Sequence, residues 1–294
     1  MSRRITPLGA LSLAAAIVLG VPAASFAYSL LPLTTEEAQT LPNNVIEATL
    51  GMNYFHNLRY PPFTPPSIIT SETLMSLPVV GFRVGVGDWA EFQASYEMLY
   101  LNETAVDGTT NNQYGGGDAR IGAKLWFMRE RDLWPALGLR IVTKLPNAKR
   151  TDGLGTDDTD FGAAALASKT IGPLSVHINL GILLLGNSGP IYGNSFGAGG
   201  QDDLVSYAIG IASKPLGATA DGTTTLRLLG EFAGQTASRF DNELSDIRVG
   251  LQMQHGRGTV YLGVSTGLVS GSEQIGVNAG FTYTFDPFKL FASD

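Results

Sequence analysis

The residues best suited to catalysis or metal binding near neutral pH are three histidines, His56, His177 and His255. They are far apart in sequence, and none has a second histidine or a carboxylate at the spacing of a metal site. A hydrolase needs a nucleophile and a base within hydrogen-bonding reach, and local spacing supplies no such pair. We therefore predict that the chain is not an enzyme and binds no metal or cofactor. We interpret His177 as a side chain bonded to its neighbours.

The segment TDGLGTDDTD at residues 151–160 is rich in carboxylates and glycines, a composition found in calcium-binding loops. It lacks the ligand spacing and the final glutamate of an EF-hand. We interpret it as a loop of turn residues that precedes a strand beginning near Thr159, and calcium binding is the alternative.

Charged and polar residues also recur at every second position of several segments. Residues of one parity share one face of a strand, so this pattern places charges of both signs on one surface. Opposite charges on adjacent strands can pair, and we expect Arg120 and Arg140 to pair with Glu97 or Asp118. Structural ion pairing and recognition of an ion or solute both remain open as roles. The residues predicted to line this polar surface are Arg83, Glu91, Glu97, Asp118, Arg120, Lys124, Arg140, Lys144, His177, Asn179, Arg227, Glu231, Asp246 and Arg248.

The elements that carry these residues read as strands. In LSVHINLGILLLG at 174–186, apolar residues occupy one parity, while Ser175, His177 and Asn179 share the other. Period two with one apolar parity indicates a strand whose two faces contact different surroundings. About twelve such segments are present, each near the length that crosses a bilayer at a tilt. Their predicted ranges are 44–55, 78–87, 89–101, 117–128, 134–145, 159–170, 173–186, 203–214, 223–236, 244–255, 258–269 and 274–285.

These strands predict an all-β fold, a transmembrane antiparallel up-and-down β-barrel of about twelve strands with lipid outside and a wet lumen inside. A secreted β-sandwich or soluble barrel, with the apolar parity as its core, is the alternative. The connections alternate between long and short, as in bacterial outer-membrane barrels, so both termini are expected on the periplasmic side. A strand number of twelve is intermediate between that of eight-stranded barrels, whose interior is filled by side chains, and that of wide porins. We therefore predict a narrow pore, constricted by an inward-folded loop.

The start of the chain indicates its compartment. Residues 1–27 contain two arginines, an apolar run and a small-x-small ending at Ala27, the pattern of a secretory signal peptide, with a membrane anchor as the alternative. We predict a signal peptide over 1–27 and one barrel domain over 28–294. Loss of Arg3 and Arg4 takes the formal net charge from −7 to −9, which argues against nucleic acid as a partner. The absence of cysteine excludes disulfides and thiolate metal sites.

Residues 139–186 resemble the "MetA-pathway of phenol degradation" family of outer-membrane transporters. The shared features are KLP at 144–146, GLGT at 153–156, Asp160, GP at 172–173 and HxNxG at 177–181. The resemblance implies an outer-membrane channel associated with uptake of aromatic or other hydrophobic compounds. The residue pattern by itself supports a barrel with a polar interior.

We therefore predict a porin-like channel of the bacterial outer membrane that admits small solutes, with membrane lipid and these solutes as its partners. Two alternatives stay open: a lipid-modifying barrel enzyme centred on His177 or His255, and a structural or adhesive surface barrel with a plugged lumen. The sequence fixes neither the solute nor the oligomeric state.

Overall fold

A computed structural model describes residues 29–58, 69–186, 203–218, 223–237, 244–269 and 271–290; the predicted signal peptide lies outside these ranges. The described chain is almost entirely β, with a 3-10 turn, η1 (Arg150–Asp152), and a short helix, α2 (Pro287–Leu290). The strands are β1 (Ile46–His56), β2 (Ile69–Val86), β3 (Ala90–Ala105), β4 (Thr110–Gly116), β5 (Ala119–Met128), β6 (Ala136–Leu145), β7 (Asp160–Ile171), β8 (Leu174–Leu184), β9 (Leu204–Ser213), β10 (Leu216–Ala218), β11 (Thr224–Ala237), β12 (Leu244–His255), β13 (Gly258–Gly267) and β14 (Ile275–Phe285).

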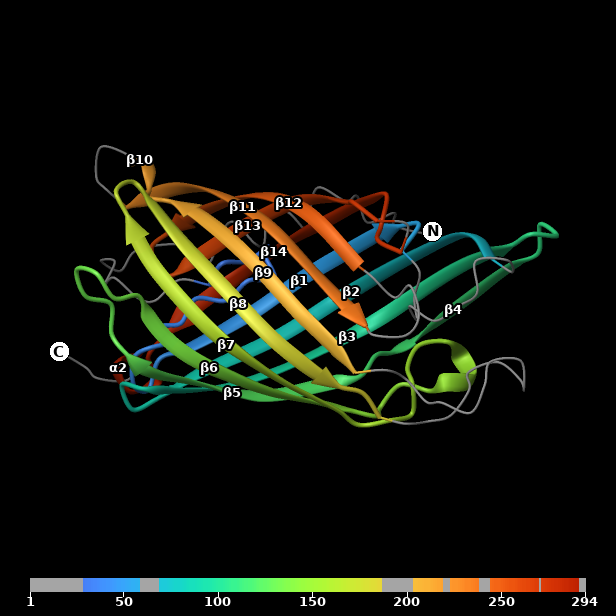
Figure 1. The fold of residues 1–294 in the computed structure, drawn as a ribbon, viewed down its shortest axis with the longest axis horizontal. Coiled ribbons are helices and arrows are strands. Elements are labelled where there is room, and N and C mark those ends of the chain that lie inside the picture. The colour runs from blue at the N-terminus through green and yellow to red at the C-terminus, as the bar shows by residue number, and fades with distance from the viewer. Residues whose placement is uncertain are drawn as a thin grey trace, which may run out of the picture.

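Twelve of these strands close into an antiparallel barrel, as predicted (Figure 1). Sequential strands pair with each other, and β1 closes the ring by pairing with β14 from Ile46 opposite Phe285 to His56 opposite Ile275. Two strands lie outside the ring: β4 pairs with the far half of β3, and the short β10 pairs with the start of β11, whose main partner on that side is β9. The closed ladder leaves no free edge, which is the condition for crossing a bilayer as strands.

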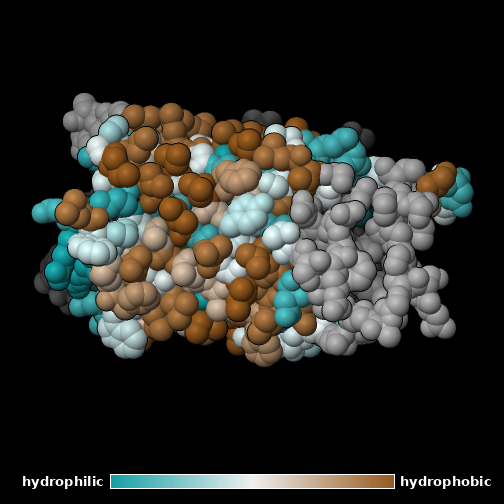
Figure 2. Space-filling view, viewed as in Figure 1, coloured by the Kyte–Doolittle hydropathy of each residue, from teal (hydrophilic) through white to brown (hydrophobic). Residues whose placement is uncertain are grey.

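The outer surface of the barrel is apolar, because one parity of each strand points outward. On β8, Ile178, Leu180 and Ile182 are 47%, 59% and 51% exposed, while His177, directly before Ile178, is 4% exposed. Figure 2 shows such residues as a broad apolar belt over the strands. Such a surface in water would far exceed the apolar patches of soluble proteins, so it fits contact with lipid. No helix in the described part of the chain is long and apolar enough to span a membrane.

Observed strand boundaries lie within two residues of the predicted ones, apart from two strand ends. β2 begins at Ile69, inside the segment predicted as a long loop, and its register shifts between Ser76 and Val79 beside Pro78. β3 continues to Ala105, where it forms a hairpin with β4. Neither extension shows clean alternation of apolar residues, so periodicity did not reveal them.

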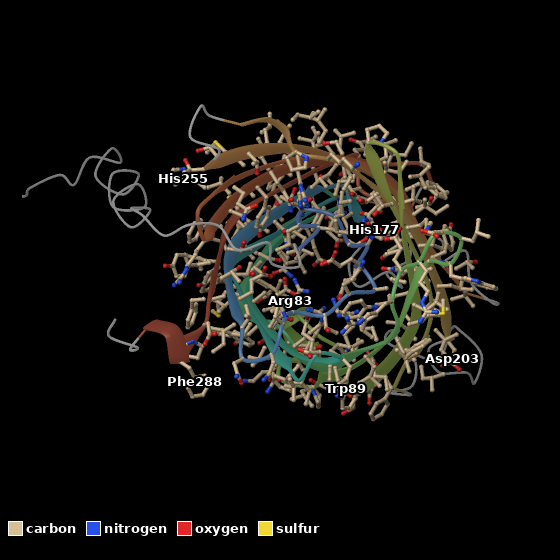
Figure 3. All side chains as sticks on the ribbon, turned by 90° about the vertical axis from the view of Figure 1, so that its left-hand side faces the viewer. Arg83, Trp89, His177, Asp203, His255 and Phe288 are labelled. Atoms are coloured by element: carbon tan, nitrogen blue, oxygen red, sulfur yellow. The ribbon has the colours of Figure 1, made fainter. Side chains whose placement is uncertain are left out.

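The segment Ser29–Val45, which we call the N-terminal segment, lies inside the barrel. Figure 3, a view close to the barrel axis, shows the blue start of the described chain within the ring of strands. Its end joins β1 at the same rim as the short turns, where Gly85 N donates to Val45 O at 2.9 Å and Asn44 N donates to Gly85 O at 3.0 Å. A Cβ atom on Gly85 would lie 2.0 Å from Pro42 O, so only glycine allows this close passage.

Candidate functional site

The N-terminal segment is held in the lumen mainly by polar side chains of the wall. At its beginning, Gln252 of β12 donates to the carbonyl oxygens of Ser29 and Leu31, both at 2.6 Å. Arg248 of β12 donates from Nη1 to Pro32 O at 3.0 Å. These side chains satisfy main-chain groups that no strand pairs with, as buried carbonyls require.

Glu231 of β11 forms the most extensive contact with this segment. Its carboxylate accepts hydrogen bonds from both the main-chain N and the hydroxyl of Thr34, each at 3.0 Å, and from the same two groups of Thr35, each at 2.5 Å. Arg248 Nη1 lies 3.7 Å from the same carboxylate. Glu231 is only 5% exposed, so this buried charge depends on the hydrogen bonds of the segment for its solvation.

Glu36 contacts polar side chains of four wall strands, β3, β5, β6 and β8. Arg140 Nε lies 2.8 Å from Glu36 Oε1, Gln93 donates to Oε2 at 2.9 Å, and Lys124 Nζ lies 3.7 Å from Oε2. The main chain of Glu36 also bonds in both directions with Asn179 of β8, at 2.7 and 2.8 Å. Donors from β3, β5 and β6 therefore converge on one carboxylate of the segment.

The chain then returns toward the short-turn rim. Ala38 N donates to Ser168 Oγ at 2.8 Å, and Leu41 N donates to Glu91 Oε2 at 2.8 Å. Apolar contacts flank the polar tip Thr34–Glu37 on both sides. They form two small clusters: Leu30 and Leu33 with Ala212 and Leu229, and Ala38 with Ala136 and Leu166.

Around Glu36, wall charges form a compact network. Arg83 reaches Glu47 at 3.0 Å and Glu91 at 2.8 Å, and Lys124 lies 3.6 Å from Glu91. Lys124 and Glu91 are 0% and 1% exposed, and such buried charges are tolerated only when they are paired. We name as the central charge cluster the residues Glu36, Glu47, Arg83, Glu91, Lys124 and Arg140.

Of the two arginines predicted to pair with Glu97 or Asp118, only Arg120 does so. Arg120 Nη1 lies 2.9 Å from Glu97, as expected. The prediction that Arg140 pairs with Glu97 or Asp118 is wrong, because the N-terminal segment supplies its carboxylate. Asp118 instead lies 3.2 Å from Lys144 Nζ. A partner outside the strands was invisible to reasoning from strand parity alone.

At the long-loop rim, Lys144 also lies 2.6 Å from Asp160. The loop between β6 and β7 packs over this rim, where buried Leu154 clusters with Leu74 on the extended part of β2 and with Leu99 and Leu101 of β3. This loop therefore folds against β2 and β3 near the long-loop rim. Of the other predicted residues, Asp246 lies 3.4 Å from Arg248 Nη2, and Arg227 lines a small cavity beside Ser29.

Each histidine bonds a hydroxyl on the adjacent strand. His177 Nδ1 lies 2.9 Å from Ser168 Oγ, a distance that would also suit a nucleophile and base. Both side chains are buried beneath Ala38, so substrate has no access to the pair. His56 and His255 lie 3.2 and 2.7 Å from the hydroxyls of cross-strand threonines. This geometry does not favour the enzyme alternative.

Within the described ranges, no three His, Asp or Glu side chains are grouped to hold a metal ion. In the segment considered for calcium, Asp160 is paired with Lys144, and Asp152 accepts from the hydroxyl of Thr151. The calcium alternative for residues 151–160 therefore gains no support from the geometry.

A cavity of about 390 Å³ lies between the N-terminal segment and the wall. Its lining includes the tip of the segment, the cations Arg83, Arg120 and Arg140, and Phe55 of β1. Since Phe55 lies near the end of β1 that faces the long loops, the cavity extends from the central charge cluster toward that rim.

The N-terminal segment is the part of the site that the sequence did not reveal. Its sequence, SLLPLTTEEAQTLPNNV, has no period of two, and parity analysis therefore passed over it. One signal was available: these residues separate the predicted cleavage site from the first strand, and they carry the adjacent carboxylates Glu36 and Glu37.

Comparisons with known proteins bear on the fold. No family model matches the sequence, and no curated protein matches it. The structure is similar to the COG4313 outer membrane channel from Pseudomonas putida F1, with a TM-score of 0.62 and 14% identity over 86% of this chain and 100% of that one. It is also similar to the translocator domain of autotransporter NalP from Neisseria meningitidis, with a TM-score of 0.52 and 11% identity over 82% of this chain and 88% of that one. These likenesses establish an outer-membrane type of barrel fold, and the resemblance to the MetA-pathway family stays a prediction.

Proposed function

We propose that the chain is a passive channel of the bacterial outer membrane that admits small solutes. The observation that carries this proposal is the interior: a charged wall enclosing a cavity of about 390 Å³, where eight-stranded barrels are filled by side chains. The apolar outer belt supports the membrane location, and the similar barrel from Pseudomonas putida F1 is described as an outer membrane channel.

The orientation follows from the turns. The short connections β2–β3, β7–β8 and β12–β13 share one rim with the start of β1, and in outer-membrane barrels this is the periplasmic rim. The exposed aromatics Trp89, Phe127 and Trp134 lie near that rim, where an interfacial girdle belongs. The N-terminal segment then closes the periplasmic half of the lumen, and the cavity faces outward.

Passage through the channel requires the tip Thr34–Glu37 to move. The wall groups that hold it, Glu231, Asn179 and Arg140, are polar, so water can replace the segment at these positions. The family resemblance adds that the solutes are aromatic or otherwise hydrophobic, and Phe55 in the cavity lining offers such a ring a contact.

Planar-bilayer recording of the refolded mature chain tests the proposal. We expect discrete conductance steps with short openings for the unmodified protein, and longer openings when the contacts at Glu231 are weakened. Absence of any conductance from both proteins, with both folded and inserted, would overturn the channel.

The filled periplasmic half favours one competing function, a structural or adhesive surface barrel with a permanently plugged lumen. The same recordings separate the two, because a permanent plug gives no openings in either protein. In that case, pull-down experiments with loop-deletion variants would test whether the long loops bind a partner.

A further inference from the structure

The position of Glu36 points to the chemistry of the solute. We propose that the donors Gln93, Lys124 and Arg140 form a carboxylate-binding site on the solute path, which the side chain of Glu36 occupies while the channel rests. This inference rests on the proposed channel function and deepens it by naming the solute class, a small carboxylate.

Geometry is the first argument. The three donors come from three adjacent strands and address both oxygens of one carboxylate: Arg140 at 2.8 Å on Oε1, and Gln93 at 2.9 Å with Lys124 at 3.7 Å on Oε2. Arg140 Nε also donates to Gln93 Oε1 at 3.0 Å, which fixes the amide so that its NH₂ group faces the anion. Charge-assisted donors arranged in this way select an anionic oxygen pair.

Charge balance is the second argument. In the central charge cluster, the wall contributes three cations, Arg83, Lys124 and Arg140, but only two carboxylates, Glu47 and Glu91. Glu36 supplies the third carboxylate, so the cluster is neutral only while the segment is in place. When the tip leaves, one wall cation has no carboxylate within the cluster, and an entering anion restores neutrality.

Access is the third argument. The side chains of Glu36 and Arg140 are 27% and 32% exposed, whereas Lys124 is fully buried behind them. Both lie on the cavity that extends toward the long-loop rim. A solute arriving from that side therefore meets Arg140 first and can form an ion pair with it before Glu36 has left.

The segment is built so that this exchange is local. The tip Thr34–Glu37 is polar, while the apolar anchors Leu33 and Ala38 lie on either side of it. The neighbouring carboxylate of Glu37 has a buried oxygen, Oε1, without a hydrogen-bond partner among the described residues. Withdrawal of the tip lets water hydrate this oxygen, which lowers the cost of the exchange.

A binding measurement tests the site separately from conduction. Isothermal titration calorimetry on the detergent-solubilised mature chain compares benzoate with benzamide, which has the same ring but no charge. We expect benzoate to bind and benzamide not to bind. Glu36→Gln should tighten benzoate binding at least about tenfold, the contribution of one charged hydrogen bond, because it removes the competing anion.

The loss-of-function variant is Arg140→Gln, which should weaken benzoate binding at least about tenfold. Lys169→Gln is the matched control, since Lys169 pairs with Glu130 outside the lumen. This variant should bind benzoate as tightly as the unmodified chain does. Misfolding cannot produce the gain expected from Glu36→Gln, so that variant keeps the test decisive. Equal binding of benzoate and benzamide, or no gain from Glu36→Gln, overturns the carboxylate site, even if the bilayer recordings show a working channel.

Discussion

Replacing Glu231 by glutamine removes the charge that holds the tip of the N-terminal segment. The carboxylate accepts four hydrogen bonds from Thr34 and Thr35, and its side chain is fully buried. A hydrogen bond to a charged acceptor contributes roughly 1.5–3 kcal/mol, and neighbouring bonds are not additive. Oε1 accepts three of the four bonds and Oε2 accepts the fourth, from Thr34 N. An amide that keeps its oxygen at the Oε1 position therefore loses the bond from Thr34 N, and the other three bonds lose their charged acceptor.

The lost bond contributes at least about 1.5 kcal/mol, and each of the three remaining bonds weakens by about 0.5 kcal/mol when its acceptor becomes neutral. The sum of about 3 kcal/mol changes an equilibrium by about 100-fold. We expect the ratio of open to closed time in single-channel recordings to rise by about this factor in Glu231→Gln. Glu97→Gln is the matched control: Glu97 pairs with Arg120 on the wall, so its loss should leave the open time nearly unchanged. Equal open times for Glu231→Gln and the unmodified chain, both folded, would refute the view that these contacts keep the lumen closed.

Two further predictions concern packing. Gly210→Ala places a Cβ atom 2.9 Å from the Cβ of Thr35, so it should displace the tip and lengthen the channel openings. Gly230→Ala is the control, because its Cβ would meet open space and should leave the openings unchanged. Unchanged recordings for Gly210→Ala would contradict this packing. Leu180→Arg, on the outward face of β8, should reduce the free energy of unfolding in lipid vesicles by about 2–4 kcal/mol, and Ile171→Arg at the short-turn rim by no more than about 1 kcal/mol. Denaturant titration measures both, and equal small losses would contradict contact of Leu180 with the bilayer interior.

The barrel was predictable because alternate residues of each transmembrane strand face lipid and the lumen, so apolar and polar residues alternate in the sequence. On β12, for example, Ile247, Val249 and Leu251 point outward while Arg248 and Gln252 point inward, and the observed strand coincides with the predicted range 244–255. The hairpin of β3 and β4 stands beyond the barrel, and TNNQYGG in β4 has no apolar parity for the same method to detect.

The lumen was predictable only in part. Parity placed Arg140 and Glu231 on the inward face, but their partners, Glu36 and the threonines of the tip, belong to a segment without secondary structure. Its position depends on contacts with strands up to 223 residues away, as between Ser29 and Gln252. Such contacts leave no local periodicity, and only the unequal number of wall charges hints that a carboxylate is supplied from elsewhere.

Locking the N-terminal segment to the wall tests whether this segment controls passage through the lumen. The chain has no cysteine, so Thr35→Cys with Gly210→Cys introduces a single pair of thiols, and the close approach of these positions allows a disulfide after a shift of under about 1 Å. In one bilayer, we predict that the oxidised double variant is closed and that adding a reductant restores conductance, while each single variant ignores the redox change. Identical conductance of the oxidised and reduced double variant, with the disulfide verified by mass spectrometry, would contradict a channel whose passage is controlled by this segment.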